Sequence, residues 1–237
     1  MATYILVHGA WHGGWCWHRI VARLQRASHR VLAPDLLSLG RDRTPPGAVS
    51  LESWSSQIAA LAQSEAEPIV LVGHSRGGIV LSEVAERIPE HIRALVYVTA
   101  FLLENSCSLQ DAAAQDPESL VPPAMIVADD HQSASIRESA MRETFYGQCS
   151  DDDVALAQSL LTPEPLAPLA TPVCTTAARF GSVPRVYVEC TRDRAITHRA
   201  QRRMQATLPC RERITLEADH SPFFCCVEEL TSVLLRI

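Results

Sequence analysis

Residues 70–81 read VLVGHSRGGIVL, an apolar run that ends in Gly-His-Ser-Arg-Gly and is followed at once by a second apolar run. This is the G-x-S-x-G pattern between an expected strand and an expected helix, the context in which it marks an exposed serine nucleophile. Gly73 and Gly77 remove the side chains that would clash when a strand turns into a helix within one turn. We therefore predict that Ser75 lies on a tight turn with its hydroxyl exposed; a plain small-residue turn is the alternative.

The residue after Ser75 adds a second expected feature. The backbone N–H of Arg76 falls at the start of the expected helix, where it can face a developing negative charge. An oxyanion needs two converging N–H donors. The second should come from the loop after the first strand, where Gly9 and its neighbouring glycines let the backbone approach closely. Ala10 and Arg76 are therefore the predicted oxyanion-hole residues.

Composition limits the class of protein. The chain has 237 residues, enough for one domain with a large core and an inserted lid. Hydrophobic residues make up 47% and charged residues 20%, which is typical of a globular protein. The net charge of −6 argues against nucleic acid or an anionic membrane as a partner. The longest apolar run, 94–103, is too short for a membrane-spanning helix.

Eight cysteines and a histidine-rich N-terminal segment raise the question of disulfides and metal. No basic-then-apolar signal segment precedes the first expected strand, and no two cysteines have C-x-x-C spacing. We therefore expect reduced thiols in a cytoplasmic protein. His8, His12 and His18 lie among glycines that break any helix aligning them, and no carboxylate or cysteine set completes a site. We expect no metal.

Strand and helix patterns alternate along most of the chain. Short apolar runs predict strands at 3–7, 31–33, 69–72, 94–100, 185–190 and 213–216, with helices between them. This rhythm predicts an α/β fold with a six-stranded, mainly parallel sheet covered by helices on both faces. Ligands bind outside the carboxyl ends of the strands in such sheets.

The alternation of strand and helix patterns stops between residues 103 and 178. That stretch shows no strand run of similar quality, and helices are expected around 109–115, 135–145 and 153–161. We predict a mostly helical lid over 103–178, inserted into a core formed by 1–102 and 179–237. Near the end of the chain, Ser221 and Pro222 should open the last helix as its N-cap and first-turn proline.

A serine hydroxyl becomes a nucleophile when a base accepts its proton and an acid orients that base. On the expected fold the order along the chain is serine, acid, histidine. Asp193 follows the fifth expected strand, and His220 follows the sixth. Asp219 is next to His220 and should point elsewhere, and Asp35 is a less favoured acid. The predicted triad is Ser75, Asp193 and His220.

Four segments carry a resemblance to a known family: 8–17, 73–78, 193–196 and 219–220. Together they resemble the plant methylesterase and hydroxynitrile lyase family of α/β-hydrolases, and the similarity extends over nearly the whole chain. The resemblance implies a six-stranded core, a helical cap, no cofactor, frequent homodimers, and small esters or cyanohydrins as substrates. It implies the same triad and the same oxyanion hole.

The resemblance also separates two activities. Lyase members have threonine at the position of Gly9 and, at the position of Ser221, a lysine that stabilises departing cyanide. Hydrolysis is therefore favoured. Arg76 departs from the family, in which a smaller or apolar residue is common after the serine. Its side chain can orient an anionic group or pair with a nearby acid, and we favour a surface or structural arginine.

The sequence thus predicts a serine hydrolase that cleaves a small to medium carboxylic ester through an acyl-enzyme, with a methyl ester among the candidates. Gly9, Trp11, Phe101 and Leu102 are the expected pocket residues. A thioesterase, lactonase or cyclase with the same triad is one alternative, and a hydroxynitrile lyase is a weaker one. A ligand-binding receptor on a hydrolase scaffold is the non-enzyme alternative.

Overall fold

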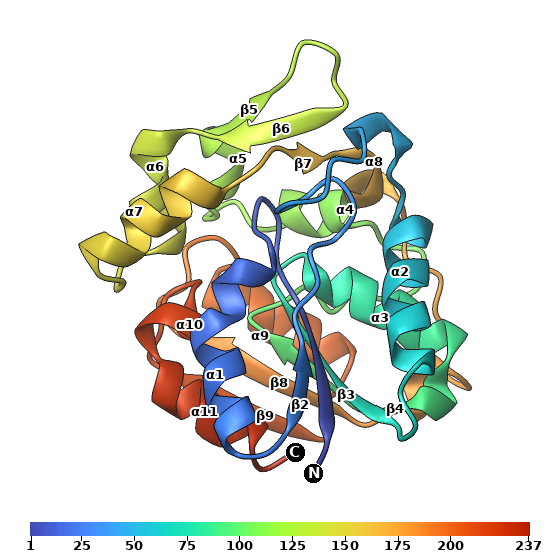
Figure 1. Ribbon diagram of the computed structural model, residues 1–237. Helices are drawn as coiled ribbons and strands as arrows, with labels where there is room; N and C mark the ends of the chain where they lie inside the picture. The colour runs from blue at the N-terminus through green and yellow to red at the C-terminus, as the bar shows by residue number, and fades with distance from the viewer.

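The computed structural model describes all 237 residues and has a six-stranded parallel sheet at its centre (Figure 1). The strand order is β2-β1-β3-β4-β8-β9. The strands are β1 Thr3–Val7, β2 Arg30–Leu32, β3 Ile69–His74, β4 Ile92–Val98, β8 Arg185–Cys190 and β9 Glu212–Leu216. The predicted α/β fold class is confirmed. β4 ends two residues before the predicted end, because Thr99 has a positive φ of 37° that leaves the strand conformation.

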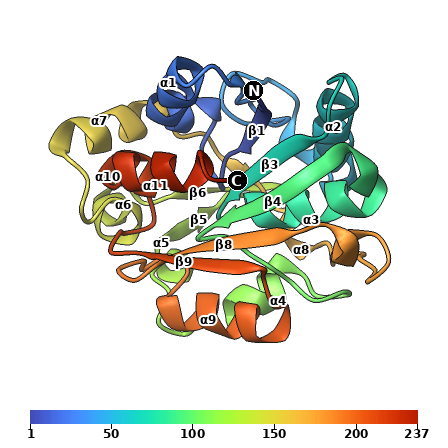
Figure 2. The same cartoon turned by 90° about the horizontal axis from the view of Figure 1, so that it is seen from below.

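Helices cover both faces of this sheet (Figure 2). They are α1 His18–Arg26, α2 Leu51–Gln63, α3 Gly77–Arg87, α9 His198–Thr207, α10 Pro222–Cys225 and α11 Val227–Leu234. Alternate strand residues face opposite sides, as the two-residue period of a strand requires. Leu71 and Tyr97 join one core with α2, α3 and α9, whereas Val72 and Val98 join the other with α1 and α11.

The segment between β4 and β8 forms a separate layer over the carboxyl ends of the strands (Figure 1). It contains α4 Leu109–Ala114, α5 Val121–Ala124, β5 Met125–Val127, β6 Ser133–Ile136, α6 Glu138–Phe145, α7 Asp151–Leu160, β7 Glu164–Pro165 and α8 Ala167–Ala170. The prediction that this segment lacks strands is wrong: β5, β6 and β7 form a three-stranded antiparallel sheet. These strands are too short to show a sequence period, and their conformation depends on cross-strand pairing.

The predicted last helix is also only partly correct. It is divided into α10 and α11 at Cys226, whose φ of −134° and ψ of 48° are not helical. Ser221 makes no side-chain cap, and its hydroxyl is buried without a hydrogen-bond partner. Pro222 does occupy the first turn, because a proline lacks the N–H that the start of a helix leaves unused.

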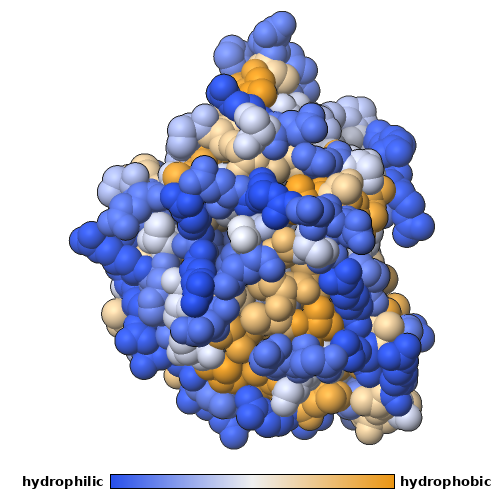
Figure 3. Space-filling view, turned by 90° about the vertical axis from the view of Figure 1, so that its left-hand side faces the viewer, coloured by the Kyte–Doolittle hydropathy of each residue, from blue (hydrophilic) through white to orange (hydrophobic).

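The surface of the protein is mostly hydrophilic on the face that faces the viewer in Figure 3. These hydrophilic side chains surround an apolar area in the lower half of that face. None of the helices combines the length and the apolar character that crossing a bilayer requires.

Candidate active site

Ser75 lies on the turn between β3 and α3, with a φ of 53°. This left-handed conformation is strained for a residue with a side chain. Two backbone hydrogen bonds hold the turn, because the carbonyl of Ser75 accepts the N–H groups of Gly78 (3.1 Å) and Phe101 (3.0 Å). A Cβ atom on Gly77 would lie 2.9 Å from the carbonyl oxygen of Val7. The turn therefore requires glycine at 77.

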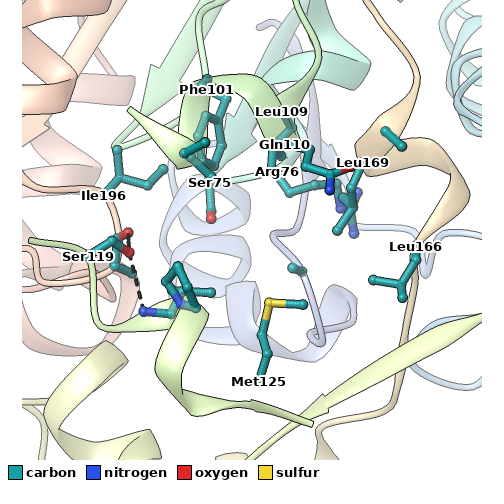
Figure 4. Close-up of a pocket in the computed structure, with 18 of the residues that line it drawn as sticks. Ser75, Arg76, Phe101, Leu109, Gln110, Ser119, Met125, Leu166, Leu169 and Ile196 are labelled. Carbon is teal, nitrogen blue, oxygen red and sulfur yellow. Dashed lines mark hydrogen bonds between the residues drawn. The ribbon is translucent and has the colours of Figure 1, made fainter. Parts of the chain in front are cut away.

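The Ser75 hydroxyl points into a cavity of about 820 Å³ (Figure 4). His220 lines the same cavity. The structure records no hydrogen bond between the Ser75 hydroxyl and the His220 imidazole. Such bonds are often long in unliganded enzymes and tighten when substrate binds. The predicted nucleophile and base therefore share one cavity wall.

Asp193 holds the other side of the His220 ring. Its Oδ2 lies 2.7 Å from His220 Nδ1, and both side chains are almost completely buried. Its Oδ1 accepts the N–H groups of Ala195 (2.7 Å) and Ile196 (2.9 Å). Because Nδ1–H of a neutral His220 donates a hydrogen bond to this carboxylate, Nε2 carries no proton and is free to accept one.

Thr99 is a further partner of Asp193 that sequence analysis missed. Its hydroxyl donates to Asp193 Oδ2, the same oxygen that faces His220. Thr99 directly follows β4 and is fully buried. The sequence does offer one indication of this role, because Thr99 is a single hydroxyl residue at the carboxyl end of an apolar strand.

The two competing acids lie elsewhere. Asp219 accepts the N–H groups of Gln148 (2.6 Å) and Ser221 (2.8 Å). Asp35 accepts the N–H of Gly14 (2.7 Å). Neither carboxylate makes a hydrogen bond to the His220 ring, so Asp193 is the acid that this geometry favours.

The backbone N–H groups of Ala10 and Arg76 donate to no acceptor within the protein. Both residues line the cavity beside Ser75. Buried backbone donors are nearly always paired. Two unpaired donors beside a nucleophile are what an oxyanion hole requires.

Two buried histidines brace the loop that carries Ala10. His8 Nδ1 donates to the carbonyl of Gly9 (2.8 Å), while its Nε2 accepts the Leu36 N–H (3.1 Å). His12 Nδ1 donates to the carbonyl of Ala10 (2.7 Å). Burial lowers the pKa of His8 to about 3 and that of His12 to about 4. Both rings are therefore neutral at pH 7 and serve as hydrogen-bonding supports.

Arg76 is not at the surface, which was one of the two favoured expectations, and its side chain is held by contacts within the protein. The guanidinium is buried, and its Nε donates to Glu164 Oε1 at 2.9 Å. Its Nη2 donates to the carbonyl of Gly9 at 3.0 Å, and it lies 4.2 Å from the ring centroid of Trp54. Burial lowers the pKa of Arg76 and raises that of Glu164, and their pairing opposes both shifts.

Glu164, on strand β7 of the layer over the sheet, was not singled out from the sequence. Its second oxygen, Oε2, accepts the N–H of Trp11 at 2.9 Å. Trp11 has a left-handed backbone conformation, with a φ of 62°. Two more of its polar groups form hydrogen bonds with the segment between β4 and β8. The Trp11 carbonyl accepts the Thr162 N–H, and the indole N–H donates to the Ala134 carbonyl, each at 2.9 Å. One lid carboxylate thus connects the two segments that carry the candidate oxyanion donors.

Two of the four expected pocket residues lie elsewhere. Trp11 and Phe101 line the cavity as predicted, whereas Gly9 and Leu102 do not. Leu102 is 1% exposed and packs in the same core as Ala100 and Leu103, away from the cavity. Gly9 lies behind the nucleophile, where an added Cβ would come within 2.9 Å of the Ser75 Cβ.

Comparisons with known proteins identify the family of this chain. The model of the alpha/beta hydrolase family matches residues 4–231. Salicylic acid-binding protein 2 from Nicotiana tabacum is 32% identical, covering 99% of this chain and 96% of its own. Methylesterase 2 from Arabidopsis thaliana is also 32% identical, covering 99% and 95%.

A solved structure is similar along its whole length. Tomato methylketone synthase I, complexed with 2-tridecanone, superposes with a TM-score of 0.90 at 25% identity, covering 99% of this chain and 96% of its own. The resemblance of this chain to plant methylesterases is confirmed by its whole-length relatives. The chain therefore belongs to the α/β-hydrolase family.

Proposed function

We propose that this protein is a carboxylic ester hydrolase in which Ser75 is the nucleophile, His220 the general base and Asp193 the acid that orients it. One observation carries the proposal. Ser75 and the Asp193-bonded ring of His220 share a cavity with two unpaired backbone N–H groups. The methylesterase name of a whole-length relative supports the same activity.

Acylation follows from the arrangement. Ser75 Oγ attacks the ester carbonyl carbon while His220 Nε2 accepts the hydroxyl proton, and Asp193 stabilises the imidazolium. The carbonyl oxygen becomes an oxyanion that accepts the N–H groups of Ala10 and Arg76, each worth about 3 kcal/mol of transition-state stabilisation. The C–O bond to the alcohol then breaks, and the alcohol leaves with the proton from His220.

Deacylation repeats these steps with water. His220 accepts a proton from a water molecule as its oxygen attacks the acyl carbon. The same two N–H groups bind the second oxyanion. Its collapse releases the carboxylic acid and returns the proton to Ser75.

The cavity indicates an ester with an uncharged, apolar group. Of its 31 lining residues, 19 are hydrophobic, and small side chains of α4 and α8 leave it wide. Its three charged side chains each make a hydrogen bond within the protein: Arg76 to Glu164, Arg203 to the Gln115 carbonyl, and Asp116 with Thr197. The apolar ketone bound by the tomato synthase fits this description. A methyl group on the alcohol side remains a candidate.

Ala113 on α4 tests this account of specificity. Ala113→Phe places a ring in the cavity and is expected to lower kcat/KM for p-nitrophenyl octanoate at least tenfold, about 1.4 kcal/mol. Turnover of p-nitrophenyl acetate should change less than twofold. Ala66→Phe, at an exposed position outside the cavity, is the matched control. An equal loss on both esters would contradict this account.

The nucleophile is tested by covalent labelling. A fluorophosphonate should inactivate the protein at one equivalent and add its mass to the peptide containing Ser75. A p-nitrophenyl ester should give a burst of nitrophenol as the acyl-enzyme forms. Stoichiometric inactivation with the label on another residue would contradict the proposal.

Each alternative function predicts a different result when the same protein is assayed with different substrates. A panel of esters, thioesters and lactones separates an esterase from a thioesterase, lactonase or cyclase. A hydroxynitrile lyase would release cyanide from mandelonitrile faster than it cleaves esters. Ser221, at the position of the lyase lysine, is buried and does not line the cavity. Tight ligand retention without turnover would indicate a receptor.

Three further statements remain predictions. Residues 103–178 are proposed to act as the lid of a core formed by 1–102 and 179–237. A homodimer is expected from the family resemblance, and light scattering measures it directly. Cytoplasmic localisation rests on the reading of the cysteines as reduced thiols.

A further inference from the structure

Three potential metal ligands converge behind the His220 loop, outside the catalytic cavity. The ligand atoms of Cys149, Asp219 and Cys225 all lie within 4.8 Å of one another. Cys149 comes from the lid turn between α6 and α7, Asp219 from the loop after β9, and Cys225 from the end of α10. None of the three lines the cavity that contains Ser75, and the proposed reaction uses none of them.

The distances fit a tetrahedral cation. Around Zn²⁺, sulfur lies at about 2.3 Å and carboxylate oxygen at about 2.1 Å, which places neighbouring ligand atoms about 3.5 Å apart. Asp219 Oδ1 lies 3.2 Å from Cys225 Sγ and 3.9 Å from Cys149 Sγ, and the distance from Cys149 Sγ to Asp219 Oδ2 is 3.6 Å. Small side-chain adjustments are therefore sufficient to admit the ion.

The carboxylate is already oriented by groups outside the cluster. The N–H of Gln148 donates to Asp219 Oδ2 at 2.6 Å, and the N–H of Ser221 donates to Oδ1 at 2.8 Å. Such outer hydrogen bonds hold ligands in metal sites and are needed for affinity. The backbone on both sides of the lid–core junction thus supports the same carboxylate.

The charge balance is also favourable. Asp219 accepts hydrogen bonds from two thiols and two N–H groups, and so carries the single negative charge of the cluster. When a divalent ion binds here, two S–H bonds break, two metal–sulfur bonds and one metal–carboxylate bond form, a water molecule completes the coordination, and two protons pass to the solvent. The net charge of this mostly buried cluster therefore does not change.

We propose that Cys149, Asp219 and Cys225 bind a thiophilic divalent cation, Zn²⁺ or Cd²⁺, with water in the fourth position. Two thiolates and one carboxylate select such ions over Mg²⁺ or Ca²⁺, which prefer oxygen ligands only. The ion would connect the lid turn to the core through Cys149 and Cys225. Binding to the folded state alone would stabilise the protein.

Cadmium is the probe, used with the reduced, full-length protein in oxygen-free buffer. We expect uptake of one equivalent, a thiolate-to-cadmium charge-transfer absorption band, and a rise in Tm of about 5 °C at a hundredfold excess over Kd. Mg²⁺ at the same concentration should produce neither signal. None of these measurements depends on enzymatic activity.

Serine variants identify the ligands, because a serine hydroxyl can still donate to Asp219 and preserve the fold. Cys149→Ser and Cys225→Ser should each weaken cadmium binding at least tenfold, and the double variant should lose the charge-transfer band. Cys174→Ser is the matched control, since Cys174 is an exposed free thiol. Undiminished binding by the double variant, or no stoichiometric uptake by the native protein, would overturn the proposal.

Discussion

Ser75→Ala is expected to lower kcat for ester hydrolysis about 10⁶-fold, because removing the nucleophile of a Ser-His-Asp triad removes most of its catalytic power. Residual hydrolysis should remain, since the N–H groups of Ala10 and Arg76 still bind an oxyanion. The measurement is the steady-state rate on a short-chain aryl ester, with ester binding followed separately.

The Ser75→Ala protein should fold normally. The Ser75 hydroxyl contacts the cavity rather than a protein partner, so Tm should stay within about 2 °C of the native value. Asp193→Asn is the companion variant, with an expected loss of about 10⁴-fold through the wrong imidazole tautomer. If Ser75→Ala turned over esters at the native rate, the proposed mechanism would be wrong.

Glu164→Ala has the largest expected effect on stability. It leaves the Arg76 guanidinium buried without its counter-charge, which costs about 3–5 kcal/mol. That corresponds to a fall in Tm of about 10 °C for a chain of this size. The Trp11 N–H also loses its acceptor, so kcat should fall as the two oxyanion donors lose their relative position. Calorimetry and steady-state kinetics measure the two effects.

A second variant separates the charge from the positioning. Glu164→Gln combined with Arg76→Met removes both charges, and replacing a buried ion pair by neutral groups often costs little stability. Tm should recover while kcat stays low, because Arg76→Met removes the hydrogen bond from Arg76 to the Gly9 carbonyl. Glu228→Gln is the control: it breaks the exposed Arg23–Glu228 pair, which contributes less than about 1 kcal/mol. A native Tm in Glu164→Ala would contradict the assigned role of the pair.

The parallel sheet was predictable because its central strands are buried on both faces and therefore read as uninterrupted apolar runs. Val70 to Val72 and Leu95 to Val98 are fully buried. The lid strands β5 and β7 have three and two residues, too few for any period to appear. Their conformation is decided by pairing with β6.

The candidate active site also combines residues that a sequence pattern marks with residues that only the folded structure reveals. Ser75, Asp193 and His220 each follow a predicted strand, and parallel strands bring their carboxyl ends to one edge. Glu164 has no such marker. Its partners are 88 and 153 positions away in sequence, and it stands between two prolines in the lid. Leu102 was misplaced because sequence order alone does not reveal which of two adjacent residues turns toward a cavity.

The three polar groups of Trp11 that bond to the lid have a consequence for the catalytic cycle. Any movement that lifts β6 and β7 away from the core must break these bonds and release the strained backbone next to Ala10. A conformer in which β6 and β7 had moved away would therefore no longer hold the proposed oxyanion donor of Ala10 in place. Substrate entry and bond cleavage would then require different positions of residues 103–178, the proposed lid.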